Sequence, residues 1–100
     1  MKKTFNEKCY EKLMKVPHGR VTTYAEIARA LKTKAYRAVG GAMKKNTNAP
    51  RVPCHRVVKS NGDVGEYNEG THKKIKLLER EGHIIKNNKV QNFKEKLYKF

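Results

Sequence analysis

Two short helical patterns stand almost back to back in the first half of the chain, and this arrangement constrains the fold more than any other feature. The first spans residues 22 to about 33, with a threonine able to cap it, and the second spans residues 34 to about 45. The apolar side of the first pattern is formed by Ile27, Ala28 and Leu31. Two short helices joined by a tight turn are typical of a helix-turn-helix motif.

Two further helices flank this pair. An amphipathic pattern over residues 5–16 ends at Pro17, and another over residues 71–81 ends at Gly82. The inward positions of the later helix are expected to be Ile75, Leu77 and Leu78.

Two small hairpins are expected between and after these helices. Val57-Val58 and Val64 flank a turn with Asn-Gly at its centre, and residues 84–90 predict a second hairpin. We therefore predict a mainly α fold with small β hairpins, a winged helix-turn-helix-like DNA-binding domain. Residues 1–86 are expected to form the domain, and residues 87–100 a basic C-terminal tail.

The charge balance points to a polyanionic partner. The chain has 24 Lys and Arg against 9 Asp and Glu, a formal net charge of +15 over 100 residues. Nucleic acid fits best, because basic side chains that neutralise phosphates release condensed counterions. The alternative is a basic, soluble surface without a specific partner.

No apolar run approaches the ~18 residues that span a bilayer, and the N-terminus lacks the apolar stretch of a signal peptide. We expect an intracellular monomer without membrane contact, cytoplasmic and nucleoid-associated, or nuclear in a eukaryote. The cysteines and histidines form no short-spaced ligand pairs, so we expect no metal and no cofactor.

The two cysteines have different settings. Cys9 lies on the apolar stripe of residues 5–16, where we expect a buried, inert thiol, because free cysteine packs as a small hydrophobe. Cys54 follows the turn-forming residues 46–53 and stands directly before His55. A thiol attacks as its thiolate, and a basic neighbour shifts a cysteine towards that form. We therefore expect Cys54 to be a reactive nucleophile.

His55 is the candidate base, acting directly or through a bridging water, because neighbouring residues of an extended segment point to opposite faces. Glu81 can orient the far ring nitrogen of His55 and complete a series of nucleophile, base and orienting group. Taken alone, an adjacent Cys-His pair also arises by chance.

A pair of glycines, Gly40-Gly41, lies inside the second helix of the central pair. Each costs about 1 kcal/mol relative to alanine in a helix interior, so small size must be useful there. Close packing against a neighbouring helix and close approach to DNA are two compatible explanations.

The segment Pro53-Cys54-His55-Arg56-Val57-Val58 resembles the active-site signature of the O6-alkylguanine-DNA alkyltransferases, also called methylated-DNA–protein-cysteine methyltransferases. Other blocks resemble that family in the same order, from about residue 5 to residue 85. They are Gly19-Arg20-Val21-Thr22-Thr23-Tyr24 with Ile27-Ala28, Arg37-Ala38-Val39-Gly40-Gly41-Ala42-Met43, Asn46, Gly62 with Val64-Gly65 and Tyr67, Leu77-Leu78, and Glu81-Gly82.

The resemblance implies DNA repair by irreversible transfer of an alkyl group from O6 of a flipped-out guanine in duplex DNA to Cys54, with O4-alkylthymine as a further candidate lesion. His55 would deprotonate Cys54 through a water, with Glu81 bonded to His55. Asn46 would brace the turn between the recognition helix and the active-site loop. Tyr24 would crowd the phosphate beside the target nucleotide and donate a proton towards the leaving guanine.

The resemblance also implies how DNA is bound. Arg37 would fill the space that the extruded base leaves, and the recognition helix would lie in the minor groove. The small residues that permit close approach are Ala38, Gly40, Gly41 and Ala42. The residues suited to phosphates are Lys44, Lys45 and Arg51. The guanine pocket would involve Val57, Tyr67, Asn68 and Met43.

The sequence departs from the family pattern in three places. Longer members carry an extra N-terminal domain, whereas this chain begins close to the DNA-binding domain. Asn68-Glu69-Gly70 stands where many members have Ser-Gly-Gly, so the tolerance of bulky alkyl groups does not carry over. The residues after 86 match nothing in the family.

Three other functions are each compatible with part of the sequence. An alkyltransferase-like protein would bind alkylated DNA without accepting the alkyl group, but such proteins replace this cysteine with a non-nucleophile. A winged-helix transcription factor would explain the charge and the helix pair but not the Pro-Cys-His-Arg loop. A cysteine hydrolase would need an oxyanion-donor motif, and none is evident.

Overall fold

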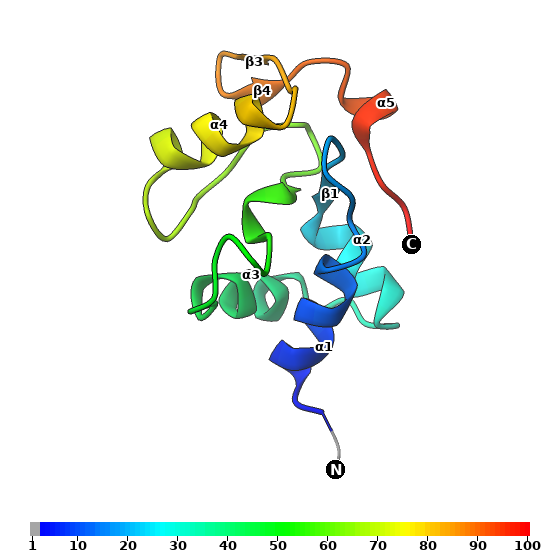
Figure 1. Cartoon of the computed structure of the whole chain (residues 1–100). Helices are drawn as coiled ribbons and strands as arrows, with labels where there is room; N and C mark the ends of the chain where they lie inside the picture. The colour runs from blue at the N-terminus through cyan, green and yellow to red at the C-terminus, as the bar shows by residue number, and fades with distance from the viewer. Residues whose placement is uncertain (1–2) are drawn as a thin grey trace.

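The computed structural model describes residues 3–100 as a set of short helices with two two-stranded sheets (Figure 1). The elements are α1 (Phe5–Leu13), β1 (Thr22–Thr23), α2 (Tyr24–Ala30), α3 (Tyr36–Lys44), the 3-10 turn η1 (Cys54–Arg56), β2 (Val57–Val58), α4 (Thr71–Arg80), β3 (Ile85–Lys86), β4 (Lys89–Val90) and α5 (Phe93–Lys96). Helices α1, α2 and α3 gather at one end of the molecule and α4 with the β3–β4 hairpin at the other (Figure 1). The mainly α, winged helix-turn-helix-like fold is confirmed.

Local hydrogen bonds set where α1 begins and ends. The side chains of Thr4 and Glu7 form a reciprocal capping box at its start. The helix stops at Leu13 rather than at the expected Val16. Pro17 disfavours the α conformation at Val16, the residue before it. Val16 remains buried, and its N–H donates to the carbonyl of Leu13 at 3.0 Å in a tighter turn.

The helix-turn-helix is present as expected. Thr23 caps α2, its hydroxyl accepting from the N–H of Glu26 at 3.0 Å. Lys32, with φ of 59°, makes the tight turn that follows. Helix α3 begins at Tyr36, two residues later than expected, because the Thr33 hydroxyl accepts from the N–H of Ala35 at 3.2 Å and holds the chain in a non-helical turn.

The first predicted hairpin is wrong. Strand β2 pairs in parallel with β1, Thr22 opposite Val57, instead of antiparallel with Val64. The expected turn does form, with the N–H of Gly62 donating to the carbonyl of Lys59 at 2.9 Å. The N–H of Val64 instead donates to the carbonyl of Asn88 at 2.8 Å. Pairing between segments this far apart in the chain leaves no local sequence signal.

The parallel pair divides the core into two clusters. Because successive strand residues face opposite sides, Val57 packs among the residues of α1, α2 and α3, while Val58 packs with Leu78 of α4. The first cluster contains Cys9, Leu13, Val16, Ile27, Ala28, Val39, Ala42, Met43, Cys54 and Val57. Cys54 thus directly precedes, in η1, the strand β2 that joins both halves of the molecule.

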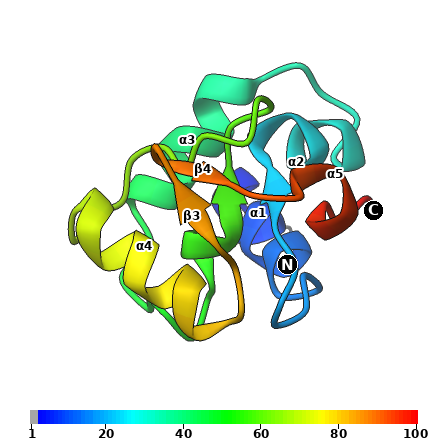
Figure 2. The ribbon, with the colours of Figure 1, turned by 90° about the horizontal axis from the view of Figure 1, so that it is seen from above.

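The second predicted hairpin is confirmed, as β3 paired antiparallel with β4. Its turn, Asn87-Asn88, has positive φ at both residues, and the expected domain boundary at residue 86 falls inside this hairpin. Figure 2 places α4 and α5 on either side of β3 and β4. The last residues are tied to the body, since Val21 donates to the carbonyl of Lys96 at 3.0 Å and accepts from the N–H of Tyr98 at 2.6 Å. Within residues 3–100, no helix combines the length and apolar character needed to cross a membrane.

Candidate active site

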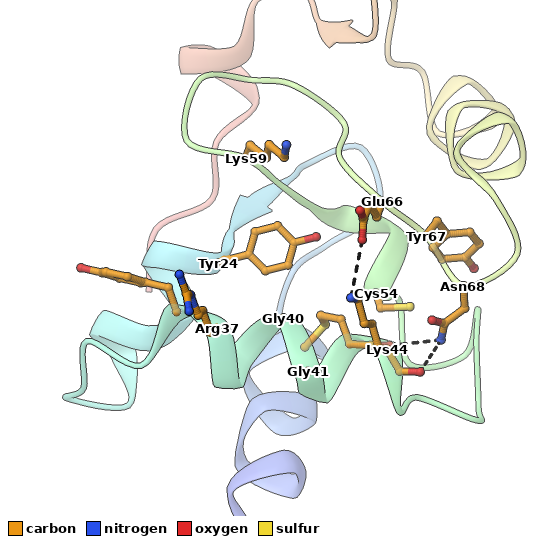
Figure 3. Close-up of a pocket in the computed structure, with 12 residues that line it drawn as sticks. Tyr24, Arg37, Gly40, Gly41, Lys44, Cys54, Lys59, Glu66, Tyr67 and Asn68 are labelled. Atoms are coloured by element: carbon orange, nitrogen blue, oxygen red, sulfur yellow. Dashed lines mark hydrogen bonds and ion pairs between the residues drawn. The ribbon is translucent and has the colours of Figure 1, made fainter.

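Cys54 opens the 3-10 turn η1, not the extended segment expected from the sequence. The N–H of Arg56 donates to the carbonyl of Pro53 at 2.9 Å and closes this turn. The thiol is 4% exposed and lines an open cavity of about 810 Å³ (Figure 3). The cavity is lined by Tyr24, Tyr36, Arg37, Gly40, Gly41, Met43, Lys44, Cys54, Lys59, Glu66, Tyr67 and Asn68.

Most of the residues singled out from the sequence meet at this cavity, from α2, α3, η1 and the loop before α4. Others lie behind or beside it. Asn46, His55, Glu81 and Val57 stand behind the wall, whereas Ala38, Lys45 and Arg51 are exposed outside the lining. The sequence reasoning missed Tyr36, Lys59 and Glu66 among the lining residues.

His55 is buried and held by Glu81, with Nε2 of the ring 2.9 Å from Oε2 of the carboxylate. An ionised carboxylate only accepts hydrogen bonds, so this contact places the ring proton on Nε2. Nδ1 is buried and has no hydrogen-bond partner within residues 3–100. Its lone pair is therefore available to accept a proton.

Arg56 is the second partner of Glu81, which sequence reasoning did not identify. Its Nε and Nη2 donate to the two carboxylate oxygens at 2.9 and 2.8 Å, and Nη1 donates to the carbonyl of Val16 at 2.8 Å. Such a bidentate pair fixes the carboxylate in one orientation. Burial alone raises the pKa of Glu81, but hydrogen bonds from Arg56 and His55 outweigh it and lower the pKa. Glu81 is thus an anion that orients His55.

The expected shift of Cys54 towards thiolate is wrong for the free protein. Burial raises the pKa of Cys54, although the nearby side chain of Asn46 and the charge of Lys74 oppose the rise. Burial also lowers the pKa of His55, against the influence of Glu81. The resting pair is therefore a neutral thiol and a neutral imidazole, and the thiolate must form when the base acts. Cys9 is fully buried, and burial raises its pKa to about 11, in keeping with the inert thiol predicted.

Lys74 is a buried cation under the site that sequence reasoning missed. Its side chain has 0% exposure, and Nζ donates to the carbonyls of Val57 at 2.7 Å and Glu66 at 3.1 Å. Burial lowers the pKa of Lys74 to about 8, while Cys54 counteracts this. A signal was present: Lys74 lies four residues before Leu78, on the same face of α4 as that core residue.

Asn46 holds the loop that presents Cys54. Its amide nitrogen donates to the carbonyl of Val52 at 2.8 Å, and its oxygen accepts from the N–H of Asn48 at 2.9 Å. These two bonds close residues 46–52 into a fixed shape next to Cys54. The asparagine therefore lies between α3 and the turn that carries Cys54.

The cavity wall formed by the loop before α4 is joined to α3. The amide of Asn68 donates to the carbonyl of Lys44 at 2.8 Å, and Nζ of Lys44 lies 3.7 Å from a carboxylate oxygen of Glu66 (Figure 3). Tyr24 and Tyr67 lie on either side of Cys54, and burial raises the pKa of each phenol to about 12. Both phenols are thus kept protonated.

The two glycines of α3 have no packing role inside the chain. A Cβ atom added to Gly40 or Gly41 would meet no atom within 4 Å beyond the helix itself. Both glycines line the cavity, so packing within the chain does not explain their small size. Within residues 3–100, no group of three or more His, Cys, Asp or Glu side chains is placed to hold a metal ion.

Comparison with known proteins agrees with this geometry. Residues 4–83 match the family described as "6-O-methylguanine DNA methyltransferase, DNA binding domain". A methylated-DNA–protein-cysteine methyltransferase of Candida glabrata is 47% identical over 87 residues, which cover 86% of this chain and 42% of the relative. The chain spans about half the length of the curated relatives it matches.

Solved structures show the same likeness. The Mycobacterium tuberculosis protein OGT, in complex with DNA, has a TM-score of 0.76 at 36% identity, covering 81% of this chain and 51% of its own. S. pombe Atl1, in complex with damaged DNA containing O6-carboxymethylguanine, has a TM-score of 0.82 at 32% identity, covering 96% and 95%. The chain therefore belongs to the family of the 6-O-methylguanine DNA methyltransferase DNA-binding domain.

Proposed function

We propose that this protein repairs duplex DNA by moving the alkyl group of an O6-alkylguanine onto Cys54, in one irreversible turnover. The observation that carries the proposal is the thiol at the cavity wall next to His55. Nδ1 of His55 is buried and has no partner among the described residues, 3–100, while Glu81 fixes the other ring nitrogen. Family membership and the net charge of +15 support a DNA substrate.

The proposed reaction is a displacement at the alkyl carbon. Nδ1 of His55 accepts the thiol proton, through a water, and the sulfur of Cys54 forms a bond to the alkyl carbon as the bond from that carbon to O6 breaks. The electron pair of the broken bond stays on guanine, which takes a proton from the phenol of Tyr24. Glu81 favours the imidazolium formed at His55, because a carboxylate partner stabilises its charge. The thioether is stable, which makes the protein a single-use reagent.

The lesion must leave the base stack to reach this sulfur, because O6 is enclosed in duplex DNA. Arg37 is exposed at the start of α3 and lines the cavity, where its side chain can occupy the space of the extruded base (Figure 3). Gly40 and Gly41 leave the surface of α3 open to a close-lying minor groove. The exposed residues proposed to meet this groove or the phosphates are Ala38, Lys44, Lys45 and Arg51.

The extruded guanine would fit between α3 and the loop before α4. Met43, Tyr67 and Asn68 line this space. Val57, which was also expected here, lies fully buried behind the wall, where its carbonyl accepts from Lys74. The pocket would thus combine apolar walls with a few polar groups that orient the purine.

Binding of damaged DNA without transfer is the second candidate function. The whole-length likeness to S. pombe Atl1, whose structure contains damaged DNA, favours it. Cys54 favours transfer, because only a nucleophile at this position can accept the alkyl group.

Intact-mass spectrometry separates the two functions. After incubation with duplex DNA containing O6-methylguanine, we expect the protein to gain the mass of one methyl group on the peptide that contains Cys54. Cys54→Ala should gain none and still bind the duplex, whereas Cys9→Ala should react as the unaltered protein does. A protein that binds the lesion but keeps its mass would overturn transfer in favour of binding alone.

A further inference from the structure

Tyr36 is a large aromatic residue on the surface, exposing 51% of its area at the first position of α3. It lines the Cys54 cavity next to Arg37. It also lines a second, shallower hollow of about 480 Å³ between α2 and the turn that leads to α3. The ring of Tyr36 therefore stands where the two hollows meet.

The second hollow carries positive charge that the protein does not neutralise. Glu26 and Arg29 form an ion pair with each other on its wall. Lys32 and Lys34 are both exposed, and within residues 3–100 neither has a carboxylate at salt-bridge distance. Lys32 and Lys34 therefore line a surface that continues, through Tyr36, from the Cys54 cavity.

Resting on the function proposed above, we propose that the DNA contact extends over Tyr36 into this second hollow. The ring packs against the nucleotide that flanks the extruded base, and Lys32 and Lys34 bind phosphates further along the duplex. An aromatic ring is suited to the first task because every base offers a flat face on which it stacks. Unpaired lysines are suited to the second because they exchange counterions for phosphate.

Tyr36 is tested by equilibrium binding to a duplex that contains O6-methylguanine, with Cys54→Ala as the parent protein so that no transfer occurs. We expect Tyr36→Ala to raise Kd at least about fivefold, the lower bound of the loss for one stacked base. Tyr36→Phe should stay within about twofold of the parent, because the ring face is kept.

The lysines are tested by the salt dependence of the same Kd. Lys32→Gln and Lys34→Gln should each reduce the slope of log K against log salt by about 0.9, the value for one phosphate contact on B-DNA. Lys76→Gln, at an exposed position of α4 outside both hollows, is the matched control and should leave the slope unchanged.

The outcomes separate the two proposals. If the parent binds the lesion duplex but Tyr36→Ala binds equally well, or if both lysine variants keep its salt slope, the extended contact is overturned and the repair function stands. If the parent protein does not bind the lesion duplex, the proposed function fails, and this inference fails with it.

Discussion

The ammonium group of Lys74 donates a hydrogen bond of 2.7 Å to the carbonyl of Val57, three residues after the nucleophile. A fully buried lysine is rare, and here it is paired with carbonyl groups rather than with a carboxylate. Its positive charge opposes the rise that burial causes in the pKa of Cys54. Lys74 is thus placed to favour the thiolate when it forms.

Replacing Lys74 with Met tests this charge. We expect the pKa of Cys54 to rise, because a nearby positive charge is removed, and the alkylation rate by iodoacetamide at pH 7.5 to fall about tenfold. The measurement is the pH dependence of that rate in a Cys9→Ala background. Lys76→Met, exposed on the same helix, should leave the profile unchanged, and coinciding profiles for the two variants would refute the electrostatic role.

Glu81→Gln should destabilise the protein strongly. Glu81 is largely buried and bonds both His55 and Arg56, so its removal leaves the guanidinium of Arg56 without its anion. Breaking such a pair costs roughly 3 kcal/mol, which urea unfolding would show as a lower midpoint with an unchanged slope. Glu79→Gln, two residues before Glu81 and exposed, should change stability by no more than about 0.5 kcal/mol. Equal effects of the two substitutions would contradict the importance of this ion pair.

Asn46→Ala should loosen the loop before Cys54. It removes two hydrogen bonds at a nearly buried position, each worth about 1 kcal/mol, so the free energy of unfolding should fall by about 2 kcal/mol. It should also raise the pKa of Cys54, because the side chain of Asn46 lowers that pKa. Asn48→Ala keeps the backbone N–H that Asn46 binds and serves as the control. Loss of stability without any change in thiol reactivity would separate the loop from the chemistry.

Acid should destabilise the fold through its buried histidines. His83 is 4% exposed with both ring nitrogens lacking partners within residues 3–100, and burial lowers its pKa below the ordinary 6.5, with Lys96, Glu81, His18 and His55 as the nearby charged or titratable groups. As pH falls through 6.5, His83 becomes protonated in the unfolded chain while it stays neutral in the folded protein. The free energy of unfolding therefore falls.

His83→Leu should flatten this dependence. The buried His55, whose pKa is also lowered, will leave a residual slope. Urea midpoints between pH 7.5 and 5 provide the measurement. His72→Gln, at an exposed position of α4, should keep the original slope, and a His83→Leu protein that does the same would show that His83 is not the titrating group.

Elements defined by neighbouring residues could be predicted from the sequence. Threonine capping of α2, the helical spacing of Ile27 and Ala28, and the Asn-Asn turn between β3 and β4 all depend on contacts within a few residues. The family motif around Cys54 likewise singled out the candidate nucleophile and its neighbours. In each case the residues concerned are only a few positions apart, so their spacing along the chain already indicates that they are neighbours in space.

Only the tertiary structure decided the environment of these groups. Pairing of β2 with β1, burial of Lys74 under Val57, and the hold of Arg56 on Glu81 join segments 17 to 35 residues apart. Those contacts fix how much water surrounds each charge, which determines whether a thiol or a thiolate is stable. The sequence alone thus singled out Cys54 and His55 as candidates, but the folded chain determined that the thiol rests neutral, because the polarity around a sulfur atom is set by atoms that remote segments bring to it.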